Sequence, residues 1–157
     1  MGQVSAALGG GLSFDFKGRA YRLAPWQFGP VIARYEEHVE RRAWAALRRL
    51  KGMQADDGSP LYPAHEVAAQ EDRLRTAIAN GDMSFGQPDV MAGLFSPHNL
   101  PELLYLQMAA VDGQHVTREL AKEMCVEDGD RMAKLAIDAN PRKGAPAGGE
   151  PAAPANG

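Results

Sequence analysis

Cysteine is the residue that this chain most clearly lacks. A single cysteine, Cys125, is present among 157 residues. One thiol excludes an internal disulfide and any zinc site built from several cysteines. Cys125 lies between Met124 and Val126, and this apolar setting predicts a buried, unreactive thiol.

Long hydrophobic runs are also missing. No apolar stretch approaches the roughly 20 residues that a membrane-spanning helix needs. The first residues lack the basic region and the apolar length of a signal peptide. Ala6 stands where a myristoylation signal requires Ser or Thr. We therefore expect a cytoplasmic protein without a membrane partner, in which residues 1–11 form a flexible leader.

Complete metal and phosphate motifs are absent as well. His65-Glu66 begins like the zinc-protease pattern H-E-x-x-H, but Ala69 replaces the second histidine. Gly9-Gly10-Gly11 is not followed by Lys and Ser or Thr, as a phosphate loop would require. The other histidines lie far apart in the sequence; they are His38, His98 and His115.

Asp128-Gly129-Asp130 resembles the start of a calcium loop. The later ligand positions hold Met132 and Lys134, which cannot supply the oxygen ligands. This acidic segment therefore predicts a helix start, where carboxylates favour the helix dipole. No spacing suggests a Ser-His-Asp arrangement, so we expect no enzyme, no cofactor and no metal site.

Two short strands are the clearest feature that is present. Phe14 and Phe16 alternate with polar residues, and so do Tyr21 and Leu23. Gly18 accepts a positive φ angle in the turn between them. The sequence therefore predicts a β-hairpin near the start of the chain.

Helices account for most of the rest. Apolar spacings of three and four predict one helix from Gly29 to about Leu50 and another over about 64–80. The stripe of the first helix comprises Ile32, Tyr35, Val39, Ala43, Ala46 and Leu50. A short helix over about 89–95 and a helix over 100–111 follow. The latter is apolar on nearly every side, which places it at the centre of the core.

Two further helices are expected near the end of the predicted domain. Thr117 is a typical N-cap for a helix to about Met124, and Glu127 to Asn140 predicts the last helix. The fold class is α+β, mainly α, with an N-terminal β-hairpin packed on a small helical bundle. We expect a single domain over residues 12–141. Residues 142–157 are rich in Gly, Ala and Pro, which predicts a disordered tail.

Charge is distributed unevenly. Residues 1–51 carry nine Lys/Arg and four Asp/Glu, a balance of +5, whereas residues 52–157 carry eight and sixteen, a balance of −8. The two halves can attract each other within one monomer or between copies, or both charge sets can simply be solvated. The basic run from Arg41 to Lys51 could contact phosphates. The chain is acidic overall and residues 117–140 lack a basic face, so we expect no nucleic-acid partner.

Two stretches resemble phage tail-assembly chaperones, which keep the tape-measure protein soluble while the tail tube polymerises. The first is Phe14-Asp-Phe-Lys-Gly-Arg-Ala-Tyr-Arg-Leu-Ala-Pro25, followed by a helix rich in Glu and Arg. The second is the layout of helices from Leu103 to Asn140. Together they cover roughly half of the chain, and the segment from Gln54 to Gln87 departs from the pattern.

The resemblance implies a role but assigns no partner-binding or catalytic residues. It implies a non-catalytic phage or prophage protein of the host cytoplasm. The implied partner is the tape-measure protein, with the tail tube protein as a further candidate. Self-association is a separate expectation, which follows from the uneven charge of the two halves. The alternative is a structural minor tail or neck component that stays in the virion.

Overall fold

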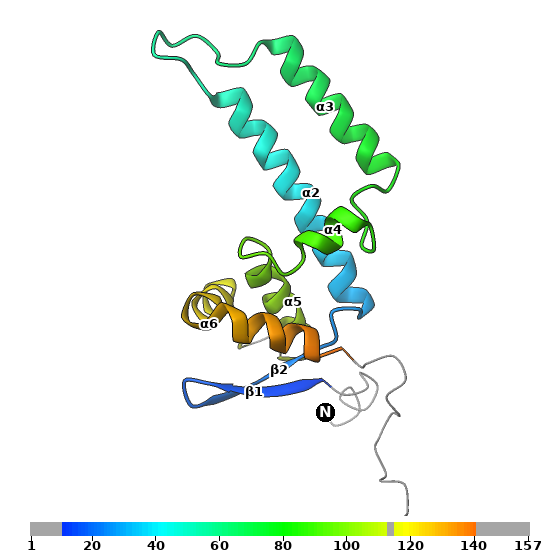
Figure 1. The fold of residues 1–157 in the computed structure, drawn as a ribbon, viewed down its shortest axis with the longest axis vertical. Helices are drawn as coiled ribbons and strands as arrows, with labels where there is room; N and C mark the ends of the chain where they lie inside the picture. The colour runs from blue at the N-terminus through cyan, green and yellow to red at the C-terminus, as the bar shows by residue number, and fades with distance from the viewer. Residues whose placement is uncertain (1–10, 113–114, 141–157) are drawn as a thin grey trace, which may run out of the picture.

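The computed structural model describes residues 11–112 and 115–140, which form a two-stranded hairpin followed by helices (Figure 1). The elements in chain order are β1 (Leu12–Phe16), β2 (Arg19–Leu23), α2 (Gly29–Gly52), α3 (Ala64–Ala79), α4 (Pro88–Gly93), α5 (Leu100–Asp112) and α6 (Arg118–Asp138). The predicted fold class, α+β and mainly α, is confirmed. The predicted tail lies outside the described residues, as does the predicted leader apart from Gly11.

The hairpin forms as its sequence pattern predicts. The strands pair antiparallel, with Phe14 opposite Tyr21. Lys17 and Gly18 both have positive φ angles, 50° and 76°, and this kind of turn matches the right-handed twist of the strands. Strand alternation then gives the hairpin one buried face, formed by Phe14, Phe16, Tyr21 and Leu23.

Helix α5 is the centre of the core. It contacts α2, α6 and β2, and Leu103, Leu104 and Met108 are completely buried. The buried Gln107 joins three elements: its backbone oxygen accepts from the Ala24 N–H at 2.9 Å. Its side-chain Nε2 donates to the oxygens of Ala24 and Ala136, at 2.9 and 3.2 Å. The prediction of a central helix over 100–111 is therefore confirmed.

Helix α6 packs on α5 and touches the hairpin. Thr117 is its N-cap, as predicted, and the hydroxyl oxygen accepts from the N–H of Leu120 at 3.1 Å. The helix runs past Met124, the predicted end of its first segment, to a kink at Asp128. Lys17 in the hairpin turn forms ion pairs with Glu123 and Glu127 of α6. The two charge sets of the sequence thus meet within one monomer at this point.

An arm projects from the body of the molecule (Figure 1). It consists of the outer half of α2, residues 41–52, and the antiparallel α3. Both buried residues of α2, Val31 and Tyr35, lie in its inner half, so the arm is only one helix pair thick. The loop between α2 and α3 lies at the opposite end of the molecule from the hairpin.

Some details of α2 differ from the sequence predictions. Ala46 was expected on the apolar stripe but is exposed, because the outer half of α2 has only α3 to pack against. The i,i+4 spacing of Glu37 and Arg41 favours an ion pair, but these two residues form none in the described structure. Instead, a neighbouring arginine, Arg42, donates to Oδ1 of Asn99 at 2.5 Å. Among residues 11–112 and 115–140, no helix combines the length and apolar composition needed to cross a membrane.

Candidate functional site

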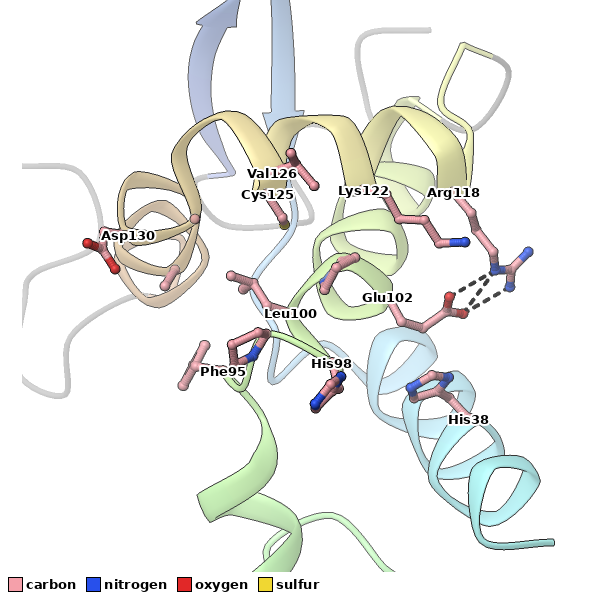
Figure 2. A pocket seen from close by; sticks show the side chains of 14 residues that line it. His38, Phe95, His98, Leu100, Glu102, Arg118, Lys122, Cys125, Val126 and Asp130 are labelled. Atoms are coloured by element: carbon pink, nitrogen blue, oxygen red, sulfur yellow. Dashed lines mark hydrogen bonds and ion pairs between the residues drawn. The ribbon is translucent and has the colours of Figure 1, made fainter. Parts of the chain in front are cut away.

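A groove of about 720 Å³ lies where α2, α5, α6 and the α4–α5 connection meet (Figure 2). Its middle is mostly apolar, and polar side chains stand toward its ends. The lining residues are His38, Phe95, Pro97, His98, Leu100, Pro101, Glu102, Arg118, Lys122, Cys125, Val126, Gly129, Asp130 and Ala133. The volume falls within the roughly 300–1,000 Å³ typical of ligand pockets.

The kink in α6 shapes one wall of this groove. Asp128 has non-helical angles, φ −154° and ψ 75°. Its Oδ1 accepts from the N–H of Arg131 at 3.1 Å, so its side chain caps the second helical segment. The acidic segment is therefore a helix start, as predicted. Val126 lies just before the kink and its side chain is 86% exposed at the groove.

A tight turn builds the opposite wall. The N–H of Leu100 donates to the Ser96 oxygen at 2.8 Å, and Nδ2 of Asn99 donates to the Gly93 oxygen at 2.9 Å. Asn99 Oδ1 also accepts from Arg42 and lies 3.3 Å from Nε2 of His38. Asn99 thus ties this turn to α2, and the prolines on either side of it are held in place.

An ion pair closes one end of the groove. Arg118 binds Glu102 through two parallel contacts, Nε to Oε2 and Nη2 to Oε1, both at 2.9 Å. The guanidinium also lies 4.4 Å from the ring centre of Tyr105. The contact with Glu102 raises the pKa of Arg118. Because its partners already satisfy Arg118, Lys122 is the cation at this end that has no ion pair among the described residues.

Burial favours the neutral form of two titratable side chains in the groove, Cys125 and His38. Burial raises the pKa of the half-buried Cys125 thiol to about 11, so at neutral pH the thiol keeps its proton and is a poor nucleophile. Burial also lowers the pKa of His38. No hydrogen bond joins Cys125 to a histidine in the described part of the chain. The predicted burial of Cys125 is only partial, because the thiol lines the groove; its low reactivity stays a prediction.

The structure places the other sequence candidates away from the groove or outside the described region. His65 and Glu66 are exposed at the start of α3, and residues 11–112 and 115–140 hold no group of three His, Cys, Asp or Glu suited to a metal ion. Gly9 and Gly10 are not described. The structure does bring His38 and His98 to one groove, which their separation in sequence did not indicate.

Comparison with known proteins identified no relative of this chain. The chain matches no family model, no curated protein and no solved structure. The groove itself offers mainly apolar side chains, with Glu102, Arg118, Lys122 and Asp130 toward its ends.

Proposed function

We propose that this protein is a tail-assembly chaperone of a phage or prophage, and that it binds the tape-measure protein in the cytoplasm of the bacterial host. The observation that carries the proposal is the apolar groove beside the kink of α6, with Val126 86% exposed at its edge. Large exposed apolar patches are typical of surfaces that bind other proteins. The resemblance of the hairpin and the closing helices supplies the class of client.

The groove suits a helix that presents an apolar stripe. In the helix-in-groove mode, side chains spaced three and four residues apart enter an apolar trough. Phe95, Pro97 and Val126 offer apolar contacts along this groove. A long helical client exposes such stripes until it assembles, so a protein that covers one stripe keeps the client soluble.

The polar ends of the groove suit a particular orientation of that helix. Lys122 stands beside the Glu102–Arg118 pair, and Asp130 lines the groove beyond the kink. A helix carries partial positive charge at its N-terminus and partial negative charge at its C-terminus. The favoured client therefore points its C-terminal end toward Lys122 and its N-terminal end toward Asp130.

Co-expression with the tape-measure protein from the same phage or prophage tests the function. We expect the client to stay soluble and to co-purify with this protein. Because the contact is mainly apolar, binding should survive about 0.5 M salt, at which exposed charge contacts are largely screened. Precipitation of the client despite co-expression would contradict the proposal.

A charge-reversal variant tests whether the client is bound by apolar contacts or by charge. Arg41 and Arg48 are exposed on α2 and form no ion pair in the described structure. Arg41→Glu with Arg48→Glu should leave client binding unchanged, whereas Val126→Asp should abolish it. Loss of binding in the arginine variant, with the fold intact, would show that the client is held by charge.

The virion-component alternative predicts a different fate. A chaperone leaves before the particle matures, so mass spectrometry of purified particles should not detect it. Detection in mature particles, together with failure to solubilise the client, would favour a minor tail or neck protein.

A further inference from the structure

The end of the arm carries exposed apolar side chains that the proposed function does not use. We call residues 47–67 the arm tip; it comprises the end of α2, the connecting loop and the start of α3. Met53, Leu61 and Tyr62 are 44%, 47% and 37% exposed there. Large apolar side chains are seldom left clustered on a surface without a partner.

Backbone hydrogen bonds order the loop that carries these side chains. The N–H of Leu61 donates to the Met53 oxygen at 2.9 Å. Gln54 pairs with Pro60 in an antiparallel bridge, and the N–H of Ala55 donates to the Ser59 oxygen at 2.9 Å. The loop is thus a small hairpin that presents Leu61 and Met53 side by side. A preorganised projection loses little entropy when it docks.

A hollow lies beside these projections. It has a volume of about 110 Å³ between α2 and α3 and is lined by Leu47, Leu50, Tyr62, Glu66, Val67 and Gln70. Leu47 and Leu50 are only half-buried because the arm is a single helix pair. The arm tip therefore offers both an apolar projection and an apolar hollow that can receive one.

Charged side chains of both signs lie within the arm tip, and one of them, Glu66, lines the hollow. Arg48, Arg49 and Lys51 lie on α2, and Asp56 and Glu66 follow in the loop and α3. None of these five residues forms an ion pair within residues 11–112 and 115–140. A partner of one charge sign would pair with only the three cations or only the two anions of this set.

We propose that the arm tips of two copies of this chain bind each other around a two-fold axis. A two-fold contact places the same surface on both sides, so the surface must complement itself. The arm tip meets this condition in shape, because its apolar projection can enter the hollow of the other copy. It also meets it in charge, because its cations can pair with the anions of the other copy. Pairing two arms also converts two thin helix pairs into one four-helix layer that buries Leu47 and Leu50.

Sedimentation equilibrium of the purified full chain, without any client, tests this proposal. The wild-type protein should show a reversible monomer–dimer equilibrium. Leu61→Asp should raise the dimer dissociation constant about tenfold or more, since it puts a charge into an apolar contact. Ile137→Asp is the matched control, because Ile137 is 49% exposed but lies on α6 in the body. Circular dichroism should show the same helix content in all three proteins.

Complementary variants test the charge argument. One variant has a basic arm tip, made by Asp56→Lys and Glu66→Lys. A second variant has an acidic arm tip, made by Arg49→Glu and Lys51→Glu. Each should be monomeric alone, and an equimolar mixture should form a heterodimer. A monomeric wild-type protein at all concentrations, or dimerisation unaffected by Leu61→Asp, would overturn the proposal. Since no client is present, either result leaves the chaperone proposal to its own test.

Discussion

Replacing Gln107 should reveal how strongly one buried amide links the hairpin to the helices. The side chain is completely buried, and its Nε2 donates to the oxygens of Ala24 and Ala136. Gln107→Met keeps a similar shape but removes both donors. The perturbation therefore isolates the two hydrogen bonds between α5 and its neighbours.

The expected loss of folding free energy in Gln107→Met is the difference between two opposing contributions. Each lost hydrogen bond costs about 1 kcal/mol, and a buried oxygen left without a donor can raise that cost to about 1–3 kcal/mol. The Oε1 atom of Gln107 has no partner in the described structure, so its removal returns part of this cost. We expect Gln107→Met to lower the free energy of unfolding by about 2–3 kcal/mol.

Urea unfolding, followed by circular dichroism and tryptophan fluorescence, provides the assay. The denaturation midpoint should fall while the slope with denaturant stays constant. Gln107→Glu should be less stable still at neutral pH, because it buries a charge without a cation. The stability of the Gln107→Glu protein relative to wild type should recover toward about pH 4, because the introduced carboxyl takes up a proton and loses its charge. A Gln107→Met protein as stable as wild type would show that the two hydrogen bonds add no net stability.

Three further substitutions or measurements probe the core and the groove. Leu104→Ala should cost about 2–5 kcal/mol, because Leu104 is completely buried and the change leaves a cavity; an unchanged melting temperature would contradict this. The thiol of Cys125 should react slowly with iodoacetamide at neutral pH and faster toward its pKa of about 11, as followed by mass spectrometry. Burial lowers the pKa of His38, so the unfolded chain binds the proton more readily. Stability should therefore fall as the pH decreases from about 6.5 through the lower folded-state pKa, and His38→Gln should flatten that part of the pH profile.

Local structure could be predicted from the sequence because it depends on neighbouring residues. The alternation around Phe14 and Tyr21 and the turn at Gly18 gave the hairpin. Thr117 marked a helix start by its capping hydroxyl. The all-round apolar pattern placed Leu104 in the core. In each case the physical cause lies within a few residues of the feature.

The groove and the arm could not be predicted in this way. The groove depends on Phe95 and Val126 approaching from separate elements, and on the kink at Asp128. The acidic segment predicted a helix start at the kink, but not which neighbours it would face. The exposure of Ala46 likewise follows from the way α2 extends beyond the body, which helical spacing alone does not reveal.

Photo-crosslinking from the groove shows whether the client helix lies there. A photoreactive amino acid placed at Val126, which is 86% exposed at the groove, is compared with the same group at Ile137, which is 49% exposed elsewhere on α6. Each protein is co-expressed with the tape-measure protein and irradiated. If the client occupies the groove, we expect a crosslink to an apolar face of a client helix from position 126 and none from position 137. Equal crosslinking from both positions, or none from position 126 in a complex that still co-purifies, would contradict this placement of the client.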